Sequence, residues 1–94
     1  MHKLELLQEK GKLITSEKGN SMLPRIKSGQ KHKLVTCTWE ECEINDIVYC
    51  KVSGRFFTHL VHAKNIQKGL QIGNMKGFIN GWTKTVYGKV TEVY

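Results

Sequence analysis

Long apolar runs are absent from this 94-residue sequence, and none approaches the ~20 residues that a membrane-spanning helix needs. The N-terminal stretch MHKLELLQEKGK also lacks the apolar segment of a signal peptide. These two absences argue against proteins that span a membrane or are exported by a cleaved leader. We therefore expect a cytoplasmic protein without a membrane span.

Cysteine is scarce and odd in number, and Cys37, Cys42 and Cys50 show no Cys-x-x-Cys spacing. A disulfide framework uses an even number of cysteines. Zinc sites repeat characteristic ligand spacings, which these cysteines do not form even with His59 or His62. We expect three reduced thiols that pack as small hydrophobic side chains, with no metal site and no cofactor.

Acidic residues are also few, eight against fifteen lysines and arginines, so the net charge is +7. Such a charge suits nucleic acid, an acidic partner or an anionic surface. The lysines are spread along the chain except in KSGQKHK, where Lys27, Lys31 and Lys33 form a local basic patch. We favour a solvated basic surface over a nucleic-acid-binding patch as its interpretation.

The proportions of apolar (39 %) and charged (24 %) residues are those of a folded domain rather than a disordered chain. A chain of this length has room for one core, so residues 1–94 are expected to form a single domain that needs no disulfides. Residues 1–11 are predicted to be either frayed or helical, with the helix over residues 4–8 and Gly11 ending it.

Short β-prone runs, separated by turn residues, fill the rest of the chain. Strands are predicted over residues 12–16, 32–39, 47–52, 56–64, 70–74 and 86–94. Ser53 and Gly54 predict a hairpin turn, Gly88 predicts a bulge, and GFINGW (residues 77–82) is predicted to be irregular. This spacing indicates an all-β, or β-dominated, fold built as a coiled antiparallel sheet or partly open barrel.

The one proline of the sequence, Pro24, ends the segment GNSMLP (residues 19–24), which also contains Ser21. All its polar residues are common in turns, so the segment is consistent with a purely structural turn. The alternative is that the turn presents the Ser21 hydroxyl as a nucleophile. In that interpretation Gly19 supplies permissive dihedral angles, and Pro24 keeps Leu23 out of the helical region.

A nucleophilic serine needs a base that takes its proton, and His59 is the candidate. The two-residue period of strand 56–64 places His59 on one face with Phe57 and Val61, and His62 on the other face. Desolvation among apolar neighbours would keep the imidazole of His59 neutral and able to accept a proton. The spacing alone favours the alternative, a core or interface histidine that is hydrogen-bonded to the backbone.

Four segments in a fixed order carry a resemblance to a known family: GNSMLPRIKSGQ, NDIVYCKVSGRFFTHLV, QIGNMKGFINGW and VYGKV. Residues 21–24 match a Ser-Met-x-Pro box, residues 45–48 match a Gly-Asp-Ile-Val strand, and residues 59–61 stand where a His-Arg-Val-like strand carries the base. Over roughly residues 13–94 the sequence resembles the signal-peptidase/LexA-like superfamily of serine peptidases, in particular its small, membrane-free members from phages and bacteria and its Ser-His type.

The resemblance implies a coiled antiparallel β fold in which Ser21 attacks a peptide carbonyl and His59 is the general base. The family's aspartate that supports the histidine has no counterpart here, because Gly73 and Asn74 occupy the matching stretch. Asn74 and Asn80 are the candidates for orienting His59 or lining the cleft. The backbone N–H of Ser21 would hold the oxyanion within the turn formed by Gly19, Asn20, Met22 and Pro24.

Three functions remain open from the sequence. The first is a soluble serine endopeptidase that cleaves a phage or host protein. The second is a non-catalytic interaction module on the same fold that regulates a host protein, and the third is a small basic nucleic-acid-binding domain. The sequence shows no membrane anchor and no DNA-binding domain ahead of residue 13, so we expect neither a signal peptidase of the usual kind nor a self-cleaving repressor.

Overall fold

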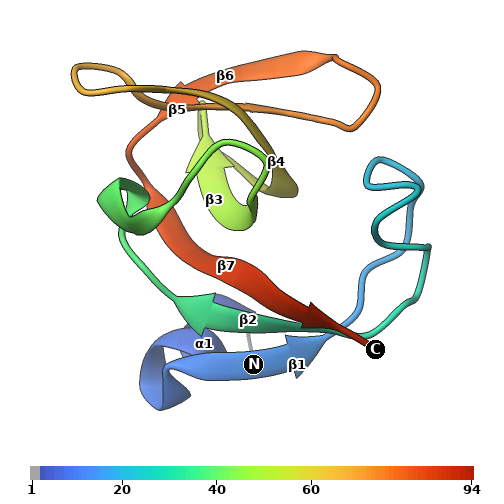
Figure 1. Cartoon of the computed structure of the whole chain (residues 1–94). Coiled ribbons are helices and arrows are strands. Elements are labelled where there is room, and N and C mark those ends of the chain that lie inside the picture. Colours follow the sequence, from blue (N-terminus) through green and yellow to red (C-terminus); the bar gives the residue numbers. More distant parts are fainter. Residues whose placement is uncertain (1–2) are drawn as a thin grey trace.

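A computed structural model describes residues 3–94 and contains, within them, one antiparallel sheet of seven strands and a short N-terminal helix (Figure 1). The elements in chain order are α1 (Lys3–Lys10), β1 (Lys12–Thr15), β2 (His32–Thr36), the 3-10 turn η1 (Trp39–Glu41), β3 (Ile47–Val52), β4 (Arg55–Asn65), β5 (Gly69–Gly73), β6 (Ile79–Thr83) and β7 (Val86–Val93). The predicted all-β class is confirmed, and the coiled sheet does not close into a barrel.

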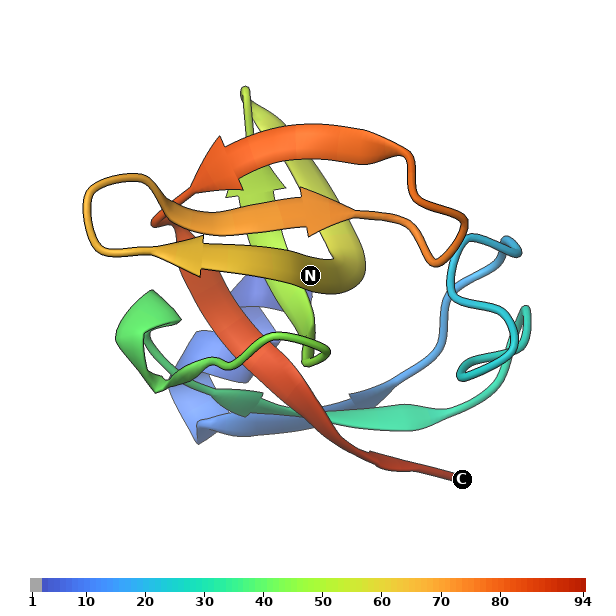
Figure 2. The same cartoon turned by 45° about the horizontal axis from the view of Figure 1, so that its top comes forward.

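The strand order is β1-β2-β7-β3-β4-β5-β6, so β7 lies between two strands that come much earlier in the chain. Figures 1 and 2 show β7, in red, running obliquely from the β5–β6 hairpin to the β1–β2 pair. Every neighbouring pair is antiparallel. β7 therefore joins the N-terminal hairpin to the β3–β6 meander.

Gly88 lets three elements approach one another at the centre of this arrangement. A Cβ at Gly88 would lie 2.8 Å from the carbonyl oxygen of Val35 and 3.2 Å from a methyl carbon of Leu7. Beside it the register between β3 and β7 shifts, since Tyr49 pairs with Gly88 but Cys50 pairs with Val86. Tyr87 is therefore the extra residue, so the bulge lies one position before Gly88, where the sequence predicts it.

The β3–β4 hairpin follows the prediction closely. Ser53 and Gly54 both have positive φ, 49° and 80°, which are the angles of a type I′ turn. This turn matches the twist of the two strands and pairs Val52 with Arg55 and Val48 with His59. The register that places His59 is therefore fixed by a local turn.

The segment GFINGW is where the prediction is wrong, because it contributes most of β6. Ile72 pairs with Gly81 and Gly73 pairs with Ile79, which leaves Asn80 as the extra residue of a bulge. Glycine lowers strand propensity, and Gly81 has a φ of 143° that few other residues adopt. Pairing with β5 outweighs this local preference.

The core is divided among three clusters, and β3 contributes to each of them. Val48, Cys50 and Val52 point into the largest cluster, together with side chains from β4 and β5. Ile47 and Tyr49 point to the opposite face of the sheet, where each belongs to a smaller cluster. β3 is the best-buried strand because it has a packed layer on both faces.

The helix α1 covers one of these smaller clusters. Leu7 is fully buried against Leu34 and Tyr49, and the helix ends where Gly11, at a φ of 75°, donates its N–H to the Leu7 carbonyl. The predicted helix is thus present and extends beyond residues 4–8 at both ends, while residues 1–2 lie outside the described part of the chain. No helix within residues 3–94 has the length and apolar character needed to cross a membrane.

Two isoleucines provide a matched test of this core. Ile72 on β5 is fully buried, whereas Ile66, in the turn that joins β4 to β5, is 85 % exposed. We expect Ile72→Ala to lower the free energy of unfolding by about 2–5 kcal/mol through lost burial and a residual cavity. Ile66→Ala should change it by less than about 0.5 kcal/mol. Urea denaturation followed by circular dichroism measures both, and equal effects would contradict the described packing.

Candidate active site

Ser21 lies in the connection between β1 and β2, residues 16–31, which forms one side of the molecule (Figures 1 and 2). Two apolar side chains anchor this loop to the sheet. Met22 and Ile26, each 6 % exposed, pack against Ile47 of β3 and Leu60 of β4. The N–H of Ile26 donates to the Met22 carbonyl at 2.9 Å, so the two anchors are held together.

The turn around Ser21 has the positive φ that the sequence suggests at Gly19, and a cis peptide bond that the sequence analysis does not predict. Gly19 has a φ of 122°, and the Leu23–Pro24 peptide bond is cis. The N–H of Leu23 donates to the Asn20 carbonyl at 3.2 Å, and the N–H of Gly19 donates to Ser28 Oγ at 3.0 Å. Within residues 3–94 the N–H of Ser21 donates no hydrogen bond, which leaves it free to act as an oxyanion donor.

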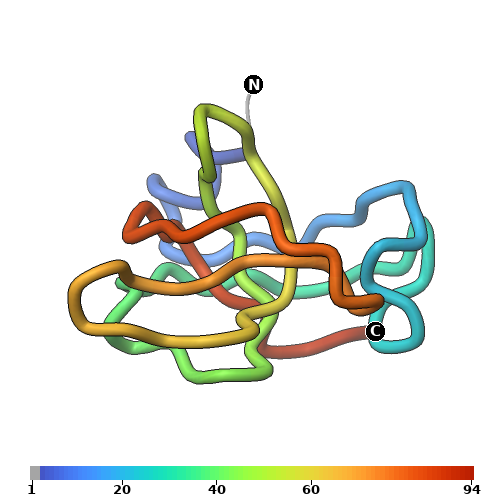
Figure 3. Tube along the Cα trace, turned by 90° about the horizontal axis from the view of Figure 1, so that it is seen from above, coloured from blue at the N-terminus to red at the C-terminus, as the bar shows by residue number. Residues whose placement is uncertain are grey.

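The backbone of Ser21 is joined to the turn between β5 and β6. The N–H of Met75 donates to the Ser21 carbonyl at 3.0 Å, and the Met75 side chain packs on the cluster that contains Met22. Figures 2 and 3 both show the blue-to-cyan loop of residues 16–31 next to the orange β5–β6 turn. This contact closes the open side of the sheet at Ser21.

His59 lies on β4 with its ring 4.9 Å from that of Phe57. Its Nδ1 is 2.7 Å from Oδ1 of Asn80, the bulged residue of β6. An amide oxygen only accepts hydrogen bonds, so Nδ1 carries the proton and Nε2 carries the free lone pair. Burial lowers the pKa of His59, the hydrogen bond that His59 donates to Asn80 opposes this, and nearby His62 lowers it further. The imidazole is therefore neutral at pH 7 and can accept a proton at Nε2.

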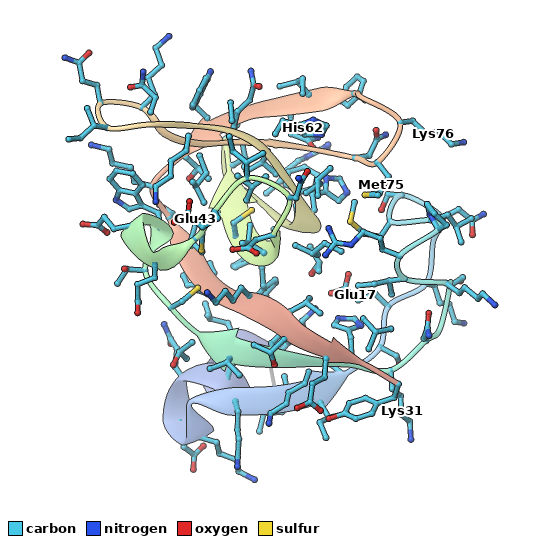
Figure 4. All side chains as sticks on the ribbon, viewed as in Figure 1. Glu17, Lys31, Glu43, His62, Met75 and Lys76 are labelled. Carbon is cyan, nitrogen blue, oxygen red and sulfur yellow. The ribbon has the colours of Figure 1, made fainter. Side chains whose placement is uncertain are left out.

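His62 occupies a second bulge, since Val61 pairs with Ile72 but Ala63 pairs with Gln71. Its Nε2 is 2.8 Å from the Asn74 carbonyl oxygen, and its ring lies over Gly73, where a Cβ would approach it to 2.9 Å. Figure 4 shows His62 under the β5–β6 hairpin, with Met75 and Lys76 in the turn of that hairpin. The ring therefore supports the turn that contacts Ser21.

The two predicted partner asparagines have different contacts. Asn80 bonds to His59, whereas the side-chain oxygen of Asn74 accepts the N–H groups of Lys76 and Phe78 at 2.9 and 3.0 Å. Asn74 therefore shapes the β5–β6 turn. Its contribution to the site is the carbonyl that His62 contacts.

Ser21 and His59 each form a hydrogen bond with residues 74–80, but they do not form one with each other among the described residues. Within residues 3–94 no hydrogen bond joins Ser21 Oγ to His59, although Met75 bonds to Ser21 and Asn80 bonds to His59. The Met22 anchor packs on Leu60, which points to the face of β4 opposite that of His59. Residues 74–80 thus connect the two predicted catalytic residues.

Three polar residues that the sequence analysis did not single out share a small cavity with Ser21. The cavity has a volume of about 30 Å³, and Glu17, His32 and Thr58 line it. Glu17 accepts a hydrogen bond from Thr58 Oγ1 at 2.6 Å and pairs with the Lys3 ammonium; Figure 4 shows it between the loop and the sheet. Thr58 lies 41 positions from Glu17 in the chain, so no local pattern signals the pairing.

His32 is 1 % exposed at the wall of this cavity. Its Nδ1 lies 3.3 Å from the Gln30 carbonyl, and its Nε2 has no hydrogen-bond partner among the described residues. Burial lowers the pKa of His32, the contact with Gln30 raises it, and the charge of Lys3 lowers it. His32 is therefore a neutral, buried histidine. The sequence does not predict its burial because it stands between two lysines.

The predicted basic patch is distributed over two surfaces. Lys27 lines the cavity beside Ser21, whereas Lys33 lines a separate hollow with Lys10 and Lys12. Lys31 is exposed, and its carbonyl accepts the N–H of Tyr94. Lys27 and Lys31 lie in the loop before β2 and Lys33 lies on β2 itself, so the lysines of this short segment do not form one patch.

Groups of three or more histidine, cysteine or acidic side chains with the geometry of a metal site do not occur within residues 3–94. The cavity beside Ser21 instead offers hydroxyl groups, the neutral imidazole of His32 and the carboxylate of Glu17. These are the groups used in nucleophilic and acid–base chemistry.

The pKa of His59 tests the Asn80 contact. Asn80→Asp should raise the pKa of His59 by about 1 pH unit or more, because a carboxylate stabilises the imidazolium. Asn80→Ala should lower it, because the hydrogen bond that raises the pKa is removed. NMR titration of the imidazole measures both. Asn65→Asp is the control, since that side chain only caps a turn about 20 Å along β4; an equal rise there would contradict the assignment.

No protein-family model matches this sequence, and no curated protein is significantly similar to it. The arrangement of Ser21, His59 and Asn80 therefore has to be interpreted from its own chemistry.

Proposed function

We propose that this protein is a serine endopeptidase in which Ser21 is the nucleophile and His59 is the general base, acting on a peptide segment of another protein. The observation that supports this best is the His59–Asn80 hydrogen bond of 2.7 Å. It fixes the tautomer with a lone pair on Nε2, and burial keeps the ring neutral. A neutral, oriented imidazole is what a general base requires.

In the proposed reaction, Ser21 Oγ attacks the scissile carbonyl while His59 Nε2 takes the hydroxyl proton. The negative charge on the carbonyl oxygen is held by the free N–H of Ser21. His59 then gives its proton to the leaving amine, and a water molecule hydrolyses the acyl-enzyme by the same proton path. Asn80 orients the imidazole but carries no charge, so the imidazolium is stabilised less than it would be by a carboxylate.

The proposal requires Ser21 Oγ to come within hydrogen-bond distance of His59 Nε2 when a peptide binds. Catalytic hydrogen bonds often lengthen in a free enzyme and tighten around substrate. The proposal therefore requires a shift of residues 16–31, although two apolar anchors and the Ser21–Met75 bond hold this loop against the sheet.

A second candidate function is a non-catalytic interaction module. Two observations favour it: Ser21 and His59 share no hydrogen bond within residues 3–94, and several large apolar side chains are exposed. They include Ile66, Phe56, Phe78 and Ile79. In this function the Ser21 turn would be a structural support, and a change at Ser21 would leave binding intact.

A fluorophosphonate probe separates the two functions without a known substrate, because it reacts with activated serines. We expect covalent labelling of Ser21, loss of labelling in Ser21→Ala, and at least a 100-fold slower reaction in His59→Ala. Ser16→Ala is the matched control, since Ser16 is exposed in the same loop. Peptide mass spectrometry locates the label. A folded protein that is not labelled, or is labelled equally well in His59→Ala, would favour the interaction module.

A further inference from the structure

We propose that Cys37 and Cys42 form a redox-active dithiol that low-molecular-weight disulfides such as oxidised glutathione convert to an intramolecular disulfide. The two Sγ atoms lie 3.4 Å apart in the reduced protein. A disulfide requires a sulfur–sulfur distance of about 2 Å, so an approach of roughly 1.4 Å is needed. Rotation of the two side chains can supply a movement of this size.

The 3-10 turn η1 creates this contact by folding the chain back. The N–H groups of Glu41 and Cys42 donate to the carbonyls of Thr38 and Trp39, each at 3.2 Å. The Glu41 carboxylate also accepts the Thr38 N–H at 2.9 Å and its hydroxyl at 3.2 Å. These bonds bring Cys42 next to Cys37, five positions earlier, and fix both thiols on a short closed turn.

Two lysines from distant strands hold the turn in place. Lys64 of β4 donates to the carbonyls of Glu40 and Cys42, both at 2.8 Å. Lys89 of β7 donates to the Glu41 carbonyl at 3.3 Å. The turn therefore cannot open easily, and the thiols stay paired.

The two thiols differ in exposure and acidity. Cys37 is half-buried, whereas Cys42 is fully buried. The hydrogen bond between the two thiols lowers the pKa of Cys37 against the opposing effect of burial. The charge of Lys89 also lowers it, whereas the charges of Glu41 and Asp46 raise it. The same hydrogen bond, with burial, raises the pKa of Cys42. Cys37 is therefore the reachable thiol that forms a thiolate more readily.

The reaction follows from this asymmetry. The Cys37 thiolate attacks one sulfur of oxidised glutathione, which forms a Cys37–glutathione bond and releases one glutathione thiolate. Cys42 then loses its proton and attacks Cys37 Sγ, forming the Cys37–Cys42 bond and releasing the second glutathione. Two protein thiols are oxidised, one glutathione disulfide is reduced to two thiols, and two protons pass to solvent or to the released thiolates.

Cys50 is the built-in control. It is fully buried on β3, and burial raises its pKa to about 12. It belongs to the same apolar cluster as Cys42, yet within residues 3–94 no hydrogen bond links its thiol to another cysteine. The proposal therefore predicts that Cys50 stays reduced.

The test equilibrates the whole protein in glutathione buffers from fully reduced to fully oxidised, followed by acid quenching and alkylation. We expect the oxidised protein to retain one of its three alkylatable thiols after denaturation, Cys50. Cleavage after Glu40, Glu41 and Glu43 separates the three cysteines into different peptides. Mass spectrometry without reduction should then find the peptide ending at Glu40 linked to the fragment that contains Cys42.

Three variants sharpen the result. Cys42→Ser should stop at a Cys37–glutathione adduct, Cys37→Ser should remain unmodified, and Cys50→Ser should form the disulfide as the wild type does. The proposal is overturned if the wild type keeps glutathione on Cys37 beside a free Cys42, if the bond involves Cys50, or if all three thiols survive in fully oxidised buffer. The wild-type measurement decides these outcomes even where a variant fails to fold.

Discussion

The pairing of β7 with both β2 and β3 is the interaction on which the rest of the sheet depends. β7 lies in the middle of the sheet although it is the last strand of the described residues. The strand order is therefore complete only once β7 has inserted between β2 and β3. Gly88 makes the insertion possible, because any larger residue would meet the Val35 carbonyl and Leu7. The same strand supplies Lys89, which braces the turn holding Cys42. β7 thus holds together the N-terminal hairpin, the β3–β6 meander and the turn that contains Cys42, which lie far apart in sequence.

Bulges, rather than regular strands, direct the side chains of the candidate active site. Asn80 is the extra residue of β6 and reaches His59, while His62 is the extra residue of β4 and reaches the β5–β6 turn. An extra residue bends its strand and turns a side chain out of the regular alternation. The site therefore depends on two local departures from sheet geometry, both next to Gly73, which leaves space for the His62 ring.

Two polar side chains that line the cavity beside Ser21, Thr58 and His32, are buried. Thr58, Glu17 and Lys3 form a partly buried chain of contacts, and His32 is buried with one ring nitrogen unpartnered among the described residues. Burying a polar group without a partner costs roughly 1–3 kcal/mol, so stability does not explain the burial of His32. It gives the Ser21 loop a polar interior beside its apolar anchors.

Local patterns in the sequence determined the type and position of most elements. The β-branched run of residues 47–52 and the Ser53–Gly54 turn specify a hairpin with a defined register, because strand alternation and positive φ are local properties. Only the tertiary structure decided that GFINGW forms a strand, since its pairing with β5 overrides the weak propensity of its glycines. The same holds for the site, where Ser21 and His59 were recognisable from the sequence as candidate residues. The contact of His59 with Asn80 depends on the bulge in β6. The cavity beside Ser21 depends on Glu17 and Thr58, which are 41 positions apart. Contacts between distant strands arise from the packing of the whole sheet, and no short stretch of sequence encodes them.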